Sequence, residues 1–280
     1  MKKIGVLGAG TMGSGIAQIV AQAGYKVFLR DIKKDFVEKG LNTIEKNLKR
    51  SVKKERISQD EMDETLENIT GTTEVEDLSD ADLVVEAVNE DMELKKKIFK
   101  ELDEVVQDDA ILATNTSALS VTEIATVTER PDKVVGVHFF NPVPVMKLVE
   151  LIRSITTTDT TFEKVESFVE ELSKTPVEVN EAPGFVVNRI LVPMINEAAF
   201  LLNEDVASAE DIDTAMKLGA NHPIGPLALG DMIGLDVCLA IMDTLYEEFG
   251  DSKYRACPLL RKKVRAGQLG RKTGEGFYNY

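Results

Sequence analysis

The chain has 280 residues, enough for one large domain or two unequal ones with a substantial core. Its formal net charge of −15 at pH 7 argues against a nucleic-acid or anionic-membrane partner, because both require a basic footprint on the protein. Two cysteines and two histidines form no disulfide framework and no metal-ligand spacing, so we expect no metal site and a cytoplasmic protein.

The chain begins with a charged start and an apolar stretch that resemble a signal peptide. Glycines interrupt this stretch and a second strand candidate follows it, so we expect no export. No segment approaches the roughly 18 uninterrupted apolar residues of a membrane span.

Short apolar, β-branched runs follow one another up to about residue 180. They are residues 3–8, 25–31, 81–88, 110–117, 134–140, 147–152 and 176–180. Helical stretches separate the first four, which predicts a βαβ series with a mainly parallel sheet covered on both faces. A charged stretch between the second and third runs is too long for a plain connection and rich in helix formers, which predicts a helical insertion at about 36–70.

The pattern becomes wholly helical after the dipeptide Pro183-Gly184. We therefore predict an α/β protein with a Rossmann-type domain at 1–183 and an all-helical domain at 184–280. The helix candidate at 185–204 is apolar on nearly every side, which favours burial against a second copy of the chain.

The segment GAGTMG is a G-x-G-x-x-G run that follows a strand candidate and opens a helix candidate, as in dinucleotide-binding turns. In such turns the first glycine permits a tight bend, the second lets a pyrophosphate approach and the third lets helix and strand pack closely. Asp31 ends the second strand candidate, where a carboxylate accepts hydrogen bonds from a ribose and repels a 2′-phosphate, although Arg30 beside it weakens this preference. We expect NAD rather than NADP, contacted by Gly8, Ala9, Gly10, Thr11, Met12, Gly13 and Asp31.

Six basic residues against one acidic residue occupy the segment from Lys46 to Arg56. Five of them would form one stripe on a helix: Lys46, Lys49, Arg50, Lys53 and Lys54. A solvated helix face and a surface for a polyphosphate-bearing substrate are both open interpretations, because charges this dense repel one another unless a counter-charge offsets them.

His138 follows the apolar run VVGV, where a strand would carry its side chain into the interior. From these residues alone, a hydrogen-bonded core histidine and a catalytic base are both possible. The other histidine, His222, precedes a proline and is interpreted as part of a turn.

Taken together, these motifs resemble the 3-hydroxyacyl-CoA dehydrogenase family, and within it the short bacterial enzymes for 3-hydroxybutyryl-CoA. The resemblance extends along the whole chain, through GAGTMGSGIAQ, ATNTSALS, VGVHFFNPVPVMKLVE, APGFVVNRI, HPIGPLALGDMIGLDV and GRKTGEGFYNY. It implies a Rossmann-type domain, a helical domain that forms a homodimer, and reversible NAD-linked oxidation of an (S)-3-hydroxyacyl-CoA.

The resemblance implies that His138 is the catalytic base, that Glu150 is its partner carboxylate, and that Ser117 and Asn188 bind the reacting oxygen. The chemistry fits, because imidazole exchanges protons near neutral pH and a carboxylate on its other nitrogen fixes the tautomer. From the residues alone, Ser117 could instead cap a helix, Asn188 could be a packing contact, and Glu150 a solvated charge.

The resemblance also implies cofactor contacts from Glu90, Lys95, Asn115, Asn141 and, more weakly, Lys272, although Glu90 and Lys95 could equally be an exposed helix pair. It assigns the basic stripe to coenzyme A, with contacts from Arg50 and Lys54. Two other classes remain as alternatives: a dehydrogenase of the 3-hydroxyisobutyrate type, which acts on free acids, and a non-enzymatic, crystallin-like dinucleotide-binding protein.

Overall fold

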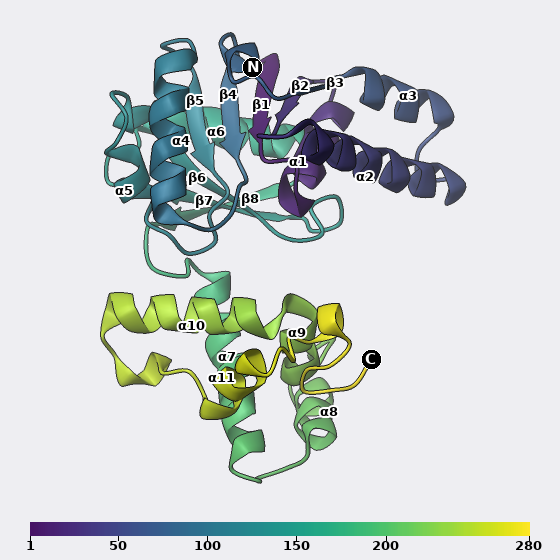
Figure 1. Cartoon of the computed structure of the whole chain (residues 1–280), viewed down its shortest axis with the longest axis vertical. Coiled ribbons are helices and arrows are strands. Elements are labelled where there is room, and N and C mark those ends of the chain that lie inside the picture. Colours follow the sequence, from purple (N-terminus) through teal and green to yellow (C-terminus); the bar gives the residue numbers. More distant parts are fainter. The chain divides into compact units, whose positions relative to one another are not determined.

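The computed structural model describes residues 1–280 and divides into two compact units, Met1–Glu181 and Ala182–Tyr280 (Figure 1). The first unit contains every strand of the sheet, and the second is helical. The predicted combination of a Rossmann-type domain with an all-helical domain is therefore confirmed. None of the helices is long and apolar enough to cross a membrane.

The N-terminal unit is built on one eight-stranded sheet with the order β3-β2-β1-β4-β5-β6-β7-β8. The strands are β1 (Lys3–Leu7), β2 (Lys26–Arg30), β3 (Ile69–Thr72), β4 (Leu83–Glu86), β5 (Ile111–Thr114), β6 (Val134–Phe139), β7 (Leu148–Arg153) and β8 (Thr175–Asn180). The strands from β3 to β6 in this order are parallel, whereas β7 runs antiparallel to β6 and β8 runs parallel to β7. The mainly parallel sheet is as predicted, but β3 begins at the end of the predicted helical insertion and extends two residues beyond it.

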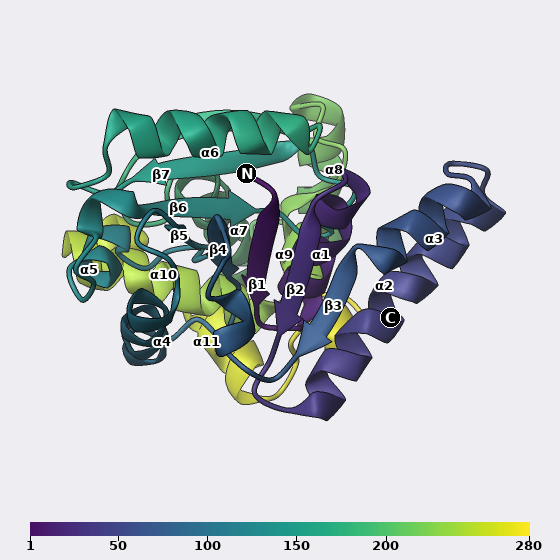
Figure 2. The ribbon, with the colours of Figure 1, turned by 90° about the horizontal axis from the view of Figure 1, so that it is seen from above.

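Six helices accompany this sheet: α1 (Thr11–Gln22), α2 (Lys34–Lys53), α3 (Gln59–Glu67), α4 (Met92–Val105), α5 (Val121–Ala125) and α6 (Asp159–Glu171). Helices α1 and α6 share one apolar core with the sheet, and α4 and α5 lie on the opposite side (Figure 2). Because both faces are covered, strands such as β4 and β5 are buried along their whole length and carry continuous apolar runs. Full burial of each Val, Leu or Ile side chain contributes roughly 1.5–3 kcal/mol.

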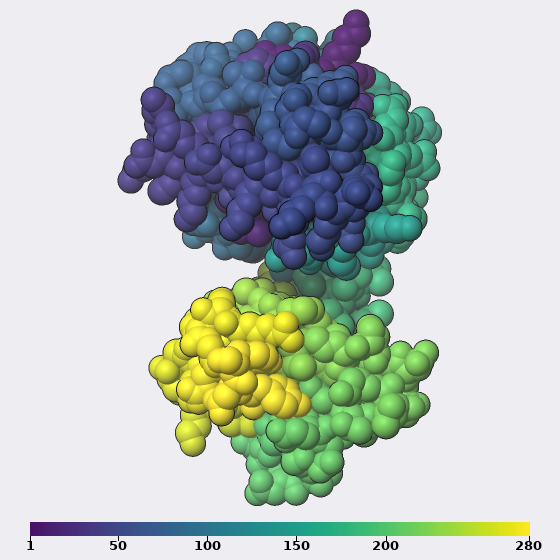
Figure 3. All heavy atoms as spheres, turned by 90° about the vertical axis from the view of Figure 1, so that its right-hand side faces the viewer, coloured from purple at the N-terminus to yellow at the C-terminus, as the bar shows by residue number.

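The insertion between β2 and β4 forms α2, α3 and the edge strand β3. Helix α2 buries Val37, Ile44 and Leu48 and turns its basic side chains to solvent. Helix α3 begins at a capping box, in which the Ser58 side chain accepts from the Glu61 N–H and the Glu61 carboxylate accepts from the Ser58 N–H. The atoms of the whole insertion, blue and purple in Figure 3, cover much of the face of the N-terminal unit that is turned to the viewer there.

The C-terminal unit contains α7 (Val187–Asn203), α8 (Ala209–Gly219), α9 (Pro226–Ile233), α10 (Leu235–Phe249) and α11 (Pro258–Arg265). Gly234, with φ of 109°, separates α9 from α10 within what reads in the sequence as one apolar stretch. Two buried carboxylates hold the end of the chain: Asp231 accepts from the N–H groups of Phe277 and Tyr278, and Asp213 accepts from the Tyr278 hydroxyl.

Candidate active site

Several of the residues predicted to bind and react lie where parallel strands end. Strand β1 pairs with β2 on one side and with β4 on the other, so the strand order reverses there and opens a crevice beyond the carboxyl ends. Gly8 follows β1, Asp31 follows β2, and Asn115 follows β5, while His138 lies near the carboxyl end of β6. Because these strands are parallel, their carboxyl ends form one edge of the sheet.

Of the three glycines in the run at this edge, two lie where a side chain would clash with the backbone, and one lies beside open space. Gly8 has φ of +100°, and a Cβ there would lie 2.6 Å from the Ala87 carbonyl oxygen. A Cβ on Gly13 would lie 1.7 Å from the Gly8 carbonyl oxygen. A Cβ on Gly10, by contrast, would meet nothing within 4 Å. Gly10 therefore leaves open space at the start of α1, where backbone N–H groups can face an anion.

A cavity of about 720 Å³ adjoins this run and is lined by Gly8, Ala9, Gly10, Thr11, Arg30 and Asp31 together with residues of α2 and α4. The Asp31 carboxylate lies at the cavity and accepts from the Ala9 N–H and the Ile32 N–H, both at 2.7 Å. Asp31 thereby fixes the glycine run. Arg30 donates through Nε to the Thr73 carbonyl oxygen at 3.1 Å. Met12, another predicted contact, packs against the core. The open glycine, the helix terminus and the carboxylate together fit a dinucleotide.

His138 and Glu150 are direct partners across the antiparallel pair β6 and β7. His138 Nδ1 lies 2.8 Å from Glu150 Oε2, and both side chains are buried. With Nδ1–H donating to the carboxylate, the lone pair of the neutral ring lies on Nε2. The ring of Phe140 packs beside the imidazole, with 4.4 Å between the centroids. Glu150 is therefore no solvated charge.

The turn between β6 and β7 contains Asn141, which is exposed and precedes a cis proline bond. Lys174, directly before β8, donates to the carbonyl oxygens of Val143 and Met146, both at 2.7 Å. Burial lowers the pKa of Lys174. No pattern in the sequence pointed to this lysine, because its partners are backbone atoms of a distant turn.

Asn115 ties the end of β5 to β6, because its Oδ1 accepts from the Phe139 N–H at 2.9 Å. Its amide therefore lies one residue from His138 along β6. Ser117 follows in the same loop. Helix α5 is capped by Ser120, whose side chain accepts from the Glu123 N–H, so the alternative that Ser117 is the cap is wrong.

Glu90 clamps the loop that carries Ser117. Its Oε1 accepts from the Thr116 hydroxyl at 2.6 Å, from the Ser117 N–H at 2.7 Å and from the Ser117 hydroxyl at 3.1 Å. Burial opposes ionisation of Glu90. The Lys95 ammonium and these hydrogen bonds outweigh burial and hold the pKa of Glu90 below its ordinary value.

Lys95 is not part of an exposed helix pair, because its side chain is 1% exposed. Its Nζ lies 2.7 Å from Glu86 Oε1 and 3.4 Å from Glu90 Oε2. Glu86 is 0% exposed and also accepts from the Thr114 hydroxyl at 2.7 Å. We did not predict a role for Glu86 from the sequence. The pattern that could have indicated one is a glutamate at the end of an apolar run that reads as a fully buried strand.

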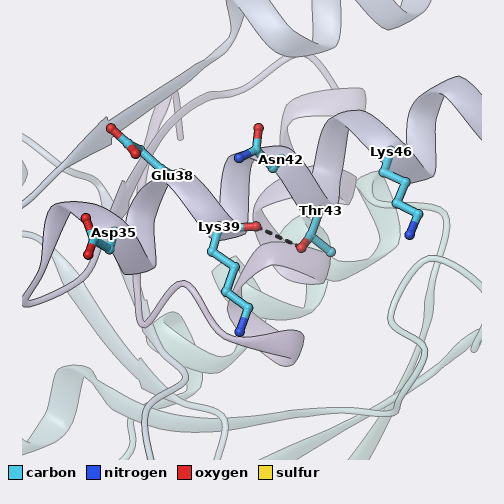
Figure 4. A pocket seen from close by; sticks show the side chains of 6 residues that line it. All are labelled: Asp35, Glu38, Lys39, Asn42, Thr43 and Lys46. Carbon is cyan, nitrogen blue, oxygen red and sulfur yellow. Dashed lines mark hydrogen bonds between the residues drawn. The ribbon is translucent and has the colours of Figure 1, made fainter.

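The basic stripe lies on the exposed side of α2, and Lys54 directly follows the last helical residue. Lys49 is partly neutralised by Glu45, at 2.5 Å, whereas Arg50 and Lys54 have no ion pair. A shallow hollow of about 340 Å³ on α2 carries mixed charges (Figure 4) and is lined by Asp35, Glu38, Lys39, Asn42, Thr43 and Lys46.

Two further predicted residues belong to the C-terminal unit. Asn188 lies in the first turn of α7. Lys272 lies 2.5 Å from Asp236, which is in the first turn of α10, and is partly exposed. The positions of both residues are described relative to the C-terminal unit alone.

Comparison with known proteins gives consistent results over the whole chain. Residues 3–182 match the NAD-binding domain of 3-hydroxyacyl-CoA dehydrogenases, and residues 184–280 match the C-terminal domain of these enzymes. The chain is 57% identical over 278 residues to a 3-hydroxybutyryl-CoA dehydrogenase of Clostridioides difficile, with 99% of each chain covered.

Solved structures show the same likeness. The (S)-3-hydroxybutyryl-CoA dehydrogenase of Ralstonia eutropha superposes with a TM-score of 0.97 at 52% identity, covering 100% of this chain and 99% of that one. A Mycobacterium tuberculosis protein, FadB2, gives a TM-score of 0.98 at 44% identity, covering 100% of this chain and 99% of that one. Both domains of the family match in order along the sequence, and the N-terminal unit has a crevice that fits a dinucleotide, so the chain belongs to the 3-hydroxyacyl-CoA dehydrogenase family of oxidoreductases.

Proposed function

We propose that the protein catalyses the reversible NAD-dependent oxidation of (S)-3-hydroxybutyryl-CoA to acetoacetyl-CoA. The observation that carries this proposal is the buried His138–Glu150 pair at the sheet edge that also bears the glycine run. The names of the relatives from Clostridioides difficile and Ralstonia eutropha support the choice of substrate.

His138 acts as the general base. Oxidation breaks the C3–H and O–H bonds of the substrate and forms a C3 carbonyl. A bound NAD would supply the acceptor for the hydride that leaves C3. The hydroxyl proton passes to Nε2 of His138, while Nδ1–H continues to donate to Glu150 at 2.8 Å. The carboxylate then stabilises the imidazolium, and in the reductive direction the same imidazolium returns the proton.

Ser117 and Asn188 bind the C3 oxygen as its charge changes during the reaction. The Ser117 hydroxyl carries one hydrogen, which it donates to Glu90 in this structure and turns to the substrate oxygen in the complex. The N–H of Ser117 also donates to Glu90, so the residue stays anchored while the hydroxyl rotates.

Asp31 favours NAD over NADP, because its carboxylate would lie beside the 2′-phosphate of NADP and repel it. Arg30 is held by the Thr73 carbonyl oxygen, which reduces its availability for that phosphate. The remaining cofactor contacts are assigned to Glu90, Asn115, Asn141 and Lys272, and the buried Lys95 is assigned to the same group through its ion pair with Glu90.

Coenzyme A is assigned to the exposed basic side of α2. Arg50 and Lys54 offer positive charge to its phosphates on a protein whose net charge is −15. A free hydroxy acid would have no use for this surface, which favours a coenzyme A ester over the substrates of 3-hydroxyisobutyrate-type enzymes.

The C-terminal unit is assigned to dimerisation. It exposes large apolar side chains, with Ile190 at 69% and Leu218 at 82%, and a second copy would remove such surface from water. Two buried free cysteines, Cys238 and Cys257, agree with a reducing compartment, and we propose the cytoplasm.

The test is an oxidation assay with NADH and NADPH on acetoacetyl-CoA, on longer 3-ketoacyl-CoA esters and on free acetoacetate. We expect turnover of the short ester with NADH, with lower kcat/KM for NADPH and for the free acid. Equal turnover of ester and free acid would favour the 3-hydroxyisobutyrate type. NADH binding without any turnover would favour a non-enzymatic dinucleotide-binding protein.

A further inference from the structure

Glu86 is a buried carboxylate that the proposed mechanism does not use. It is the last residue of β4 and is 0% exposed, beside apolar neighbours that are also fully buried. A buried carboxylate is costly unless it is paired and hydrogen-bonded. Here both oxygens have partners: Oε1 accepts from Lys95 Nζ and the Val88 N–H, both at 2.7 Å, and Oε2 accepts from the Thr114 hydroxyl at 2.7 Å.

The partner ammonium connects Glu86 to the loop of Ser117. Lys95 Nζ lies 3.4 Å from Glu90 Oε2, while the other oxygen of Glu90 accepts from the N–H and the hydroxyl of Ser117. The chain of contacts runs from Glu86 through Lys95 and Glu90 to Ser117. Glu86 and Lys95 are buried, at 0% and 1% side-chain exposure, whereas Glu90 is 38% exposed and Ser117 is half-buried.

We propose that Glu86 is a positioning residue for Ser117: it fixes the Lys95 ammonium, which orients the Glu90 carboxylate, which in turn holds the Ser117 loop. This inference rests on the proposed function, in which Ser117 binds the C3 oxygen. Glu86 itself touches neither substrate nor cofactor.

The distances explain why Glu86 is needed. Lys95 lies closer to Glu86, at 2.7 Å, than to Glu90, at 3.4 Å, so Glu86 holds the ammonium away from full contact with Glu90. Without the Glu86 charge, the buried ammonium has Glu90 as its remaining carboxylate and draws Oε2 inward. The carboxylate is rigid, so its other oxygen then moves relative to the Ser117 N–H and hydroxyl. A displacement of about 1 Å at a substrate contact can lower a rate on the order of 100-fold.

The alternative is that Glu86 contributes to folding alone. Glu86→Gln separates the two, because it keeps the shape of the side chain and removes the charge. Asp103→Asn is the matched control: it also turns a carboxylate into an amide, on helix α4, which carries Lys95, at the ion pair with Arg130 Nε at 2.6 Å. Asp103 has no contact in the chain from Glu86 to Ser117.

The measurement is a single turnover of acetoacetyl-CoA by NADH-loaded protein, followed by NADH absorbance. The amplitude reports the fraction of competent protein, and the rate reports the reaction in that fraction. We expect Glu86→Gln to lower the rate at least tenfold with an amplitude near that of the wild type. Asp103→Asn should keep the wild-type rate.

A reduced amplitude with a wild-type rate in Glu86→Gln would overturn the inference, because that is the signature of a folding role. An equal loss of rate in Asp103→Asn would overturn it as well. If Glu86→Gln does not fold, Glu86→Asp decides: it keeps the charge, moves the ammonium, and should lower the rate by a smaller factor, whereas a wild-type rate would refute the inference. A wild-type protein with no turnover would instead refute the proposed function itself.

Discussion

His138 and Glu150 occupy paired positions of β6 and β7, with 2.8 Å between Nδ1 and Oε2, although they are twelve residues apart in the chain. The pairing register sets this contact, because a slip of one residue would turn one side chain to the opposite face of the sheet. Lys174 adds to the constraint by holding the intervening turn through two carbonyl oxygens. The pair is therefore preorganised by the backbone.

Replacing His138 with Gln should remove the base and leave the dinucleotide cavity intact. We expect kcat to fall about 10²- to 10⁴-fold, the usual contribution of general acid–base catalysis. The NADH Kd should stay within about threefold, because His138 does not line the cavity beside the glycine run. Steady-state kinetics and NADH fluorescence titration test both statements, and a variant that keeps most of its rate would contradict the assignment.

Replacing Glu150 with Gln should impair the same step through the imidazolium. A neutral amide stabilises positive charge on the ring less well than the carboxylate at 2.8 Å does. For oxidation of the 3-hydroxyacyl ester, in which the neutral ring accepts the proton, we expect lower kcat and a shift of the acidic limb of the pH–rate profile for kcat/KM towards lower pH. A profile identical to that of the wild type would show that Glu150 is not coupled to the base.

Most of the fold could be predicted because strands buried on both faces leave continuous apolar runs in the sequence, as in β4 and β5. Strand β3 could not, because it is a short edge strand whose residues are only partly buried and whose sequence, ITGT, carries no apolar run. The break between α9 and α10 was missed for another reason: Gly234 takes φ of 109°, which nearby apolar residues do not reveal.

The site was predictable where the motif residues contact one another or follow strand ends, as His138, Glu150 and Asp31 do. Glu86 and Lys174 were missed, because their roles depend on partners that only the tertiary packing brings near: a lysine on α4 and the backbone of a turn. The same packing decides that Lys95 is buried, which its position in a run of three lysines does not suggest.

Replacing Lys54 with Gln should raise KM for acetoacetyl-CoA about 3- to 10-fold with little change in kcat, because a phosphate contact remote from C3 stabilises substrate and transition state alike. Lys34→Gln is the control: it is an exposed lysine at the other end of α2 and should leave KM unchanged. The acetoacetyl thioester of N-acetylcysteamine lacks the nucleotide, so its KM should not respond to Lys54→Gln. A response with that thioester would place Lys54 outside the nucleotide contact.

The clamp between Glu90 and the Ser117 loop should respond to acid. The pKa of Glu90 is lowered below its ordinary value of 4.5, so its ionised form stabilises the folded protein. That contribution is complete above pH 4.5 and is lost as the pH falls through the lowered folded-state pKa. We expect the difference in unfolding free energy between wild type and Glu90→Gln to be constant from pH 7 to about 5.5 and to shrink below 4.5. Urea titrations at each pH test this, and a difference that grows in acid would contradict it.

Two glycine substitutions should separate folding from dinucleotide binding. Gly13→Ala places a methyl 1.7 Å from the Gly8 carbonyl oxygen, so the turn must distort and the melting temperature should fall by several degrees. Gly10→Ala meets no atom within 4 Å, so the fold should be kept, while the methyl occupies the space that a pyrophosphate needs. We expect an unchanged melting temperature and an NADH Kd raised at least tenfold, about 1.4 kcal/mol. Wild-type NADH affinity in Gly10→Ala would mean that the cofactor does not approach the chain at this glycine.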